Sequence, residues 1–230
     1  KEINVPYHVL INEKCNFELC SPDAIFSLAS SFISGQMKIG PDLSLYTRIV
    51  IPEKITSIAD NGFVGYTQLK EVILHDKITY IGKNAFNGCS SLESISIPES
   101  VNSIKEGTFL NCVSLKVVDL PKSLNTIEDS AFAGCENLTT ISIPRNVRSI
   151  GNFTFSECTS LTNIKISDIQ TIRKGIFSVC PKLETITIPQ TVNTIEKFAY
   201  YKCTKVSQII IPDSVNIIKG RVFEGCTSLI

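Results

Sequence analysis

Cysteine is the residue type whose spacing most needs a chemical explanation in this chain of 230 residues. Seven of the nine cysteines follow one another after 23, 23, 23, 22, 23 and 23 residues. They are Cys89, Cys112, Cys135, Cys158, Cys180, Cys203 and Cys226. Thiols spaced so regularly could serve redox chemistry, metal binding or the packing of a repeated pocket. Each use requires a different arrangement of the sulfur atoms.

The spacing favours packing over chemistry. Equivalent residues of stacked coils lie roughly 4.8 Å apart with parallel side chains, whereas a disulfide needs converging Cβ atoms about 3.8 Å apart. Zinc sites usually contain C-x₂-C pairs, and this sequence has none. We therefore predict a ladder of buried, reduced thiols. For Cys15 and Cys20, which form a C-x₄-C pair, free thiols and a small disulfide both stay open.

No combination of residues in the sequence predicts catalysis. The two histidines, His8 and His75, are far apart in the chain, and His75 is interpreted as a solvated turn residue. A nucleophile elbow, a phosphate-binding glycine loop, H-E-x-x-H and a dinucleotide motif are all missing. We therefore expect no enzyme, no metal ligands, no cofactor and no small-molecule substrate. Asn137 and Asn152 begin N-x-T sequons, which become glycan sites only in a eukaryotic secretory pathway.

The residues around each cysteine predict the elements of a repeating coil. An aliphatic residue three positions after the cysteine leads into period-two alternation, which indicates a strand with one buried face. Proline closes most of these strands because it cannot donate a ladder hydrogen bond. A second apolar pair and an aromatic residue follow, and stretches such as NAFNGC predict one helical turn. Units of 23 residues cannot bury these side chains alone, so they must stack into a solenoid.

This pattern, L-x-x-I-x-I-P-x-x-V-x-x-I-x-x-x-A-F-x-x-C-x-x-L, resembles the leucine-rich repeats of the BspA-like family. It runs from about Tyr46 to Ile230 in about eight units. It departs at Tyr66, which replaces a cysteine, at residues 74–76, where proline is missing, and at 166–172, which is one residue short. We expect a kink or bulge near Ser167. The resemblance implies a right-handed, curved leucine-rich-repeat solenoid with a parallel sheet on one face, short second strands and single helical turns.

We divide the chain into an N-terminal capping segment, 1–45, and a solenoid, 46–230. Residues 20–35 predict a short amphipathic helix with Ser21 as N-cap and Gly35 as terminator. This helix is expected to cover the exposed end of the solenoid, and a partner-binding helix or a degenerate repeat are the alternatives. At the other end the sequence stops partway into a further strand, so we expect the repeats to continue in the full-length protein.

The composition excludes several kinds of partner. The 22 basic residues balance 22 acidic ones, and 43% of the residues are apolar. A balanced charge removes the usual argument for binding nucleic acid or an anionic membrane. No apolar run reaches the roughly 20 residues that a membrane-spanning helix needs.

The resemblance implies a protein-binding or adhesion module of a cell-surface or secreted protein. Its expected partners are host-cell or extracellular-matrix proteins, or surface proteins of other microbes. An intracellular leucine-rich-repeat scaffold is the alternative, because unpaired thiols suit a reducing cytosol.

The outward positions of the predicted sheet are the candidate binding residues. Small hydroxyl side chains predominate among them, which also suits strand residues that merely face solvent, and the lateral loops could bind instead. The candidates are Glu71, Ile73, Ser94, Ser96, Val117, Asp119, Thr140, Ser142, Asn163, Lys165, Thr185, Thr187, Gln208 and Ile210.

Overall fold

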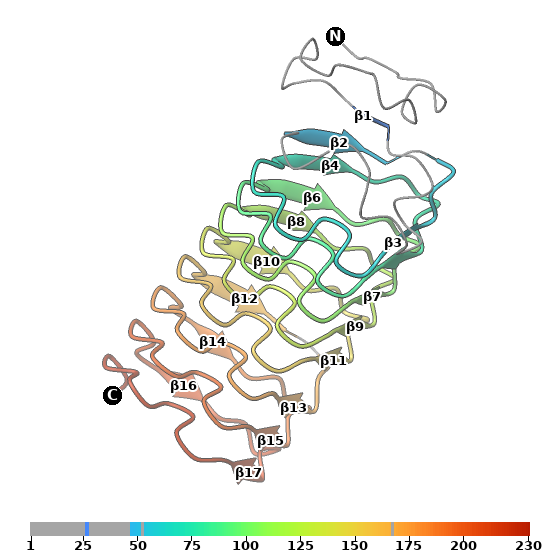
Figure 1. The fold of residues 1–230 in the computed structure, drawn as a ribbon. Helices are drawn as coiled ribbons and strands as arrows, with labels where there is room; N and C mark the ends of the chain where they lie inside the picture. Colours follow the sequence, from blue (N-terminus) through green and yellow to red (C-terminus); the bar gives the residue numbers. More distant parts are fainter. Residues whose placement is uncertain (1–25, 28–46, 52, 167) are drawn as a thin grey trace.

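The computed structural model describes residues 26–27, 47–51, 53–166 and 168–230. They form a parallel β-solenoid of about seven coils of about 23 residues (Figure 1). Each coil contributes a first strand, a second strand and a long turn segment. No helix occurs among the described residues.

The first strands form one side of the solenoid. In each three-residue strand from β6 to β12 a buried central residue lies between two exposed ones, as period-two alternation predicts. Parallel pairing joins residues 23 positions apart, such as Ile95 with Val118 and Ile141 with Ile164. The strands are β1 (Phe26–Ser27), β2 (Arg48–Val50), β4 (Glu71–Ile73), β6 (Ser94–Ser96), β8 (Val117–Asp119), β10 (Thr140–Ser142), β12 (Asn163–Lys165), β14 (Ile186–Thr187) and β16 (Ile209–Ile210).

The second strands form another side and have two residues each. They are β3 (Ser57–Ile58), β5 (Tyr80–Ile81), β7 (Ser103–Ile104), β9 (Thr126–Ile127), β11 (Ser149–Ile150), β13 (Thr171–Ile172), β15 (Thr194–Ile195) and β17 (Ile217–Ile218). Pairing is interrupted between β5 and β7 and between β11 and β13. The second interruption falls on the coil that is one residue short. Ser167, where we expected the kink, lies outside the described residues.

The turn segments correct the prediction of a helical turn in each coil. In the stretch NAFNGC, the Asn84 and Phe86 amides donate to the next coil, to the carbonyls of Glu106 and Thr108, both at 2.9 Å. Only the intervening amides bond locally, as when the Cys89 N–H donates to the Phe86 carbonyl at 3.0 Å. Asn84 also has a left-handed backbone, with φ of 51°. A helix keeps φ negative and directs its amides to carbonyls three or four residues earlier, so the coil forms successive tight turns instead.

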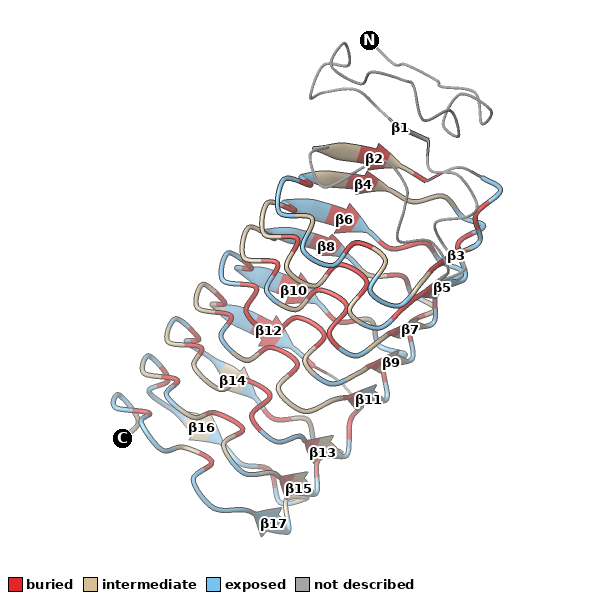
Figure 2. Ribbon diagram, viewed as in Figure 1, coloured by how far each residue is buried: buried red, intermediate tan, exposed pale blue. Residues whose placement is uncertain are grey.

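The core is a set of side-chain columns that run along the solenoid axis. Figure 2 shows buried residues recurring at the same places in successive coils. Aromatic rings stack in one column with centroids 5.2 to 5.8 Å apart and nearly parallel planes. This column consists of Phe63, Phe86, Phe109, Phe132, Phe155, Phe177, Tyr200 and Phe223. The predicted aromatic register is therefore confirmed, and it continues through the short coil.

The N-terminal segment is described only at Phe26–Ser27. We expected these two residues in a helix, but they form β1, in which Phe26 pairs with Ile49, 23 residues later. That register is the one found between later coils. The rest of the predicted helix, the proposed cap, Cys15, Cys20 and His8 lie outside the described residues.

Truncation of the aromatic column should destabilise the solenoid most at its centre. Phe132 is fully buried and stacks on Phe109 at 5.3 Å and on Phe155 at 5.6 Å. We expect Phe132→Ala to lower the free energy of unfolding by about 3–5 kcal/mol, as for other buried phenylalanines. Phe223 is half-buried and, among the described residues, stacks only on Tyr200. Phe223→Ala should cost clearly less in a denaturant titration, and equal losses would contradict this register.

Candidate functional site

The fourteen predicted binding residues lie along the first strand row. Twelve of them are exposed, whereas Glu71 and Ile73 are half-buried. Thr185 and Gln208 come directly before β14 and β16, and the other twelve lie within strands. Parallel pairing aligns them in three runs, β2 to β8, β10 to β12 and β14 to β16, as with Ser96 beside Asp119 and Ser142 beside Lys165. The structure therefore brings together residues that the sequence separates by 23 positions.

The outer face of this row is mainly uncharged. Asp119 and Lys165 provide charges in the central strands, while Glu71 at the N-terminal end is ion-paired with Arg48. Val117 and Ile210 are apolar side chains with 52% and 75% of their surface exposed. Exposed apolar groups among small hydroxyls can contact a partner without the cost of desolvating charges. Among its described residues this face thus offers small hydroxyl and apolar contact groups, with no arrangement of side chains typical of catalysis.

The repeat cysteines form the most regular polar feature of the interior. All seven are free and buried, which confirms the prediction from their spacing. Each thiol donates to the carbonyl of the aromatic residue one coil earlier, with sulfur–oxygen distances of 3.0 to 3.3 Å. The Phe86 carbonyl, for example, accepts both the Cys89 amide and the Cys112 thiol. Sequence analysis missed this bond, although the constant three-residue spacing from aromatic to cysteine was its signal.

Burial makes these thiols poor nucleophiles. It raises the pKa of Cys89, Cys158 and Cys203 from an ordinary value of 9.0 to about 12. Burial also raises the pKa of Cys135 well above that ordinary value, and the neighbouring cysteines add to the effect. Because the thiolate is the reactive form, the ladder is structural and does not supply redox or metal chemistry.

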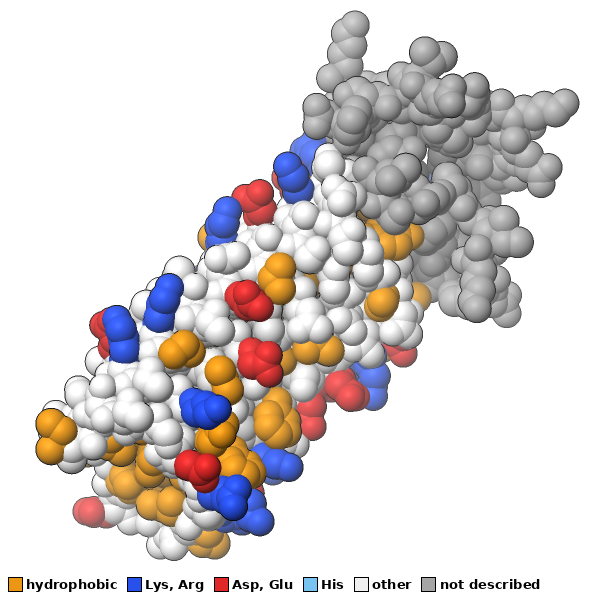
Figure 3. Space-filling view, turned by 60° about the vertical axis from the view of Figure 1, so that its left-hand side comes forward, with side chains coloured by type: hydrophobic (Ala, Val, Ile, Leu, Met, Phe, Trp, Pro, Cys, Tyr) orange, Lys and Arg blue, Asp and Glu red, His pale blue; other side chains and the backbone are white. Residues whose placement is uncertain are grey.

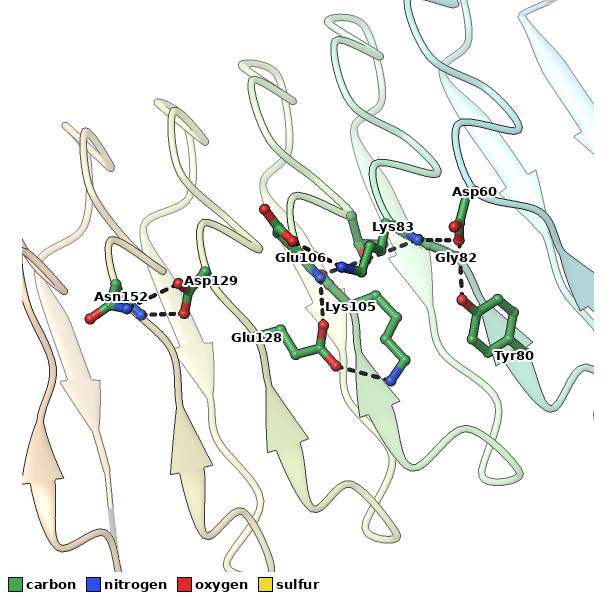
Figure 4. A network of polar contacts seen from close by, with 10 residues as sticks. Asp60, Tyr80, Gly82, Lys83, Lys105, Glu106, Glu128, Asp129 and Asn152 are labelled. Carbon is green, nitrogen blue, oxygen red and sulfur yellow. Dashed lines mark hydrogen bonds and ion pairs between the residues drawn. The ribbon is translucent and has the colours of Figure 1, made fainter.

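Polar side chains at the start of successive turn segments form a row along the solenoid (Figure 4). Asp60 Oδ1 accepts the Lys83 N–H of the next coil at 2.8 Å. A Cβ atom on Gly82 would lie 2.4 Å from the Asp60 backbone nitrogen, and one on Gly151 would lie equally close to that of Asp129. Each aspartate therefore needs a glycine one coil later. This pairing is a junction between coils.

A shallow hollow of about 420 Å³ lies over the same row. Its acidic residues are already engaged, since Lys83 pairs with Glu106 at 3.1 Å and Lys105 with Glu128 at 2.9 Å. Within the described part of the chain, no group of three or more His, Cys, Asp or Glu residues could hold a metal ion. The hollow therefore supports neither a metal site nor an acid–base pair.

The histidine and the two sequon asparagines that the sequence analysis considered form hydrogen bonds within the solenoid. His75 is half-buried, and its Nδ1 accepts the Lys77 N–H at 3.2 Å. The Asn137 amide nitrogen donates to the Val113 carbonyl at 2.9 Å. The Asn152 amide nitrogen donates to Asp129 at 3.0 Å, and Asn152 is half-buried. A glycan on either asparagine would have to displace a bond between coils.

The family of the chain follows from its repeats. Residues 43–141 and 125–230 match the model described as "BspA type Leucine rich repeat region (6 copies)". The chain therefore belongs to the BspA-type leucine-rich repeat family. This is a repeat family, and leucine-rich-repeat solenoids typically bind proteins and are typically not enzymes. No match was found among curated proteins.

Solved structures show the same fold. A leucine-rich repeat protein from Bacteroides ovatus is 32% identical with a TM-score of 0.71, over 74% of this chain and 47% of that one. This chain therefore spans about half the length of that protein. The T. pallidum leucine-rich repeat protein is 25% identical with a TM-score of 0.66, over 89% of this chain and 91% of that one. Both likenesses confirm the predicted leucine-rich-repeat solenoid.

None of the described residues belongs to a helix long and apolar enough to cross a bilayer.

The thiol ladder predicts slow alkylation of the folded protein. Cys112, Cys135 and Cys158 have no exposed surface and keep their protons at neutral pH. Iodoacetamide followed by mass spectrometry should leave them unmodified without denaturant and label them fully in guanidinium. Labelling of these three at the rate of a free peptide thiol would disprove the packing.

The same thiols predict a loss of stability at alkaline pH. An unfolded thiol ionises near its ordinary pKa of 9.0, whereas Cys158 in the fold has a pKa of about 12. The folded state thus binds more protons above pH 9.0, and its stability must fall as pH rises from there to about 12. Below pH 9.0 this contribution is constant. Denaturant midpoints should fall less steeply in Cys158→Ala than in the parent chain, and identical slopes would contradict the assignment.

Proposed function

We propose that this BspA-type leucine-rich repeat chain is a protein-binding module that uses the outer face of its first strand row. The observation that supports this is the strip of outward residues along the first strand row, exposed from Ser94 to Ile210 and mainly uncharged. Together with β4 the strip has seven strands, whose six spacings of about 4.8 Å span roughly 29 Å. A standard interface needs about 800 Å² from each partner, so most of the strip has to take part.

The proposed location is the cell surface or the extracellular space. Its support is membership of the BspA-type family, and the proposed partners are host-cell or extracellular-matrix proteins or surface proteins of other microbes. The free thiols alone would favour an intracellular scaffold. Their burial weakens that argument, because an oxidant outside the cell cannot reach the six repeat cysteines that have no exposed surface, and Cys226 is only 9% exposed.

Binding is proposed to rest on many modest contacts. Charges on the strip are few, so long-range attraction contributes little and salt should affect affinity weakly. Val117 and Ile210 offer apolar contact points among small hydroxyls that can donate or accept hydrogen bonds. Tandem copies of such a surface gain affinity through multivalency.

Three arginines on the strip test this proposal. Ser96→Arg, Ser142→Arg and Thr187→Arg together place bulk and charge on three strands, so affinity for any protein ligand found in a panel of matrix and cell-surface proteins should fall about tenfold or more. Asn102→Arg, Asn125→Arg and Gln170→Arg form the matched control, because all three residues are exposed and precede second strands. Surface plasmon resonance measures both variants after thermal unfolding confirms folding. Equal binding by the two variants would exclude the strip.

A further inference from the structure

Because the coils are equivalent, the residue types at one position can be compared between coils to see which of them the fold requires. Two positions in each turn segment have a left-handed backbone, with φ between 51° and 80° in the coils from Asn61 to Gly225. Glycine and, to a lesser degree, asparagine accept this conformation with little strain. The N-terminal coils use these two types at the first position in Asn61, Asn84 and Gly107, and a small side chain in Ser130.

The C-terminal coils place bulky side chains at most of these positions, with Gly175 and Gly225 as the exceptions. The first position holds Phe153, Phe198 and Arg221, with φ of 53°, 60° and 61°. The second position holds Glu157, Val179 and Lys202, with φ of 61°, 61° and 56°. Left-handed backbone is costly for such residues, and the fold does not need them, because asparagine or glycine serves in earlier coils. Strain that the fold does not require points to a function of the side chains.

These side chains build a cationic surface. The Lys174 ammonium lies 5.4 Å from the centre of the Phe153 ring, and the Arg221 guanidinium lies 5.9 Å from that of Phe198. Gly175 makes room for the first pair, because a Cβ atom there would come within 2.3 Å of the Phe153 ring. The rings thus hold the cations by cation–π attraction.

Lys202 extends this surface along the same coil as Phe198. Its ammonium lies 5.2 Å from the centre of the Tyr201 ring, which meets the Phe198 ring edge to face at 5.7 Å. Together with Lys197 these residues define the basic–aromatic patch, which consists of Phe153, Lys174, Lys197, Phe198, Lys202 and Arg221. Figure 3 shows basic, hydrophobic and some acidic side chains interspersed over the C-terminal coils, at the lower end of the molecule.

The charges of the patch are largely uncompensated. Lys174, Lys197 and Lys202 are exposed, and none forms an ion pair with any residue the structure describes. Arg221 has a carboxylate neighbour, Glu224, at 3.5 Å. By contrast Lys83, at the same coil position as Lys174 and Lys197, is neutralised by Glu106 at 3.1 Å. A protein with balanced total charge therefore carries a local positive field at one end.

We propose that the basic–aromatic patch binds a linear sulfated polysaccharide. Its cations belong to successive coils, whose aromatic rings are 5.6 to 5.8 Å apart in this region, so they match a chain with closely repeated anionic groups. Sulfate stays charged at every physiological pH and accepts hydrogen bonds from both ammonium and guanidinium groups. The turn segments form a different side of the solenoid from the first strand row. This site therefore does not depend on the proposed protein-binding face.

The ring contacts argue against single-stranded nucleic acid. Proteins that bind it stack bases on open aromatic faces. Here the Phe153 ring packs over Gly175 and under Lys174, and the Phe198 ring is occupied by Arg221 and Tyr201. The rings serve to fix the cations, which lowers the entropy cost of binding a polyanion.

A titration with a heparin oligosaccharide tests the proposal. The whole chain should bind it with an affinity that falls as salt rises, and should bind unsulfated hyaluronan and an oligo-dT of equal charge much more weakly. Lys174→Gln with Lys197→Gln should weaken heparin binding about tenfold or more, because two charge-assisted hydrogen bonds are lost. Lys83→Gln with Lys105→Gln removes the same charge from ion-paired sites and should leave affinity within about twofold.

A second pair of variants separates the rings from the charges. Phe153→Asn with Phe198→Asn keeps every cation and introduces the residue type that Asn61 and Asn84 already place in this backbone conformation. Calorimetry should show several-fold weaker heparin binding with the fold intact by thermal unfolding. No binding by the parent chain, equal losses in the two lysine variants, or equal affinity for oligo-dT would each overturn the proposal.

Discussion

The stacking of each coil in register on the next is the constraint on which the whole structure depends. It is enforced by hydrogen bonds that leave one coil for its neighbour, such as those from the Asn84 and Phe86 amides to the coil that follows. The Phe86 carbonyl has two donors, the Cys89 amide of its own coil and the Cys112 thiol of the next. A shift of one residue would break this pairing and turn every strand residue to the opposite face. The aromatic column and the outward strip are consequences of this register.

Much of the coil could be predicted from the sequence, because the buried positions hold apolar residues at regular spacing. The cysteine spacing, the alternation around residues such as Ile95 and the recurring aromatic residue identified the strands and core. The helical turn was wrong because its amides bond to carbonyls more than twenty residues away, as Asn84 does with Glu106, and local patterns do not show such partners. The left-handed backbone at Phe153 was equally hidden, since phenylalanine is not a residue type that predicts it.

The candidate sites were predictable to different degrees. The sequence placed most of the outward strip on exposed strand positions, since alternation decides which strand residues face solvent; Glu71 and Ile73 are half-buried, and Thr185 and Gln208 precede their strands. It did not reveal the basic–aromatic patch, because a balanced total charge hides a local excess and because Lys174 and Lys197 are 23 residues apart. Comparing the same position across all coils would have found it. In a repeat protein, a residue that the fold does not require differs from the residues at the same position of the other coils.

The hydrogen-bonded thiol column has a consequence for the lifetime of the protein. Only in the folded state are the seven thiols kept apart from one another and from oxidants, each bonded to the backbone of the preceding coil. Once a coil opens in an oxidising medium, its thiol can react and form bonds that the solenoid cannot accommodate. Unfolding in an oxidising medium therefore becomes irreversible. The lifetime of the folded protein is then set by the rate at which coils open.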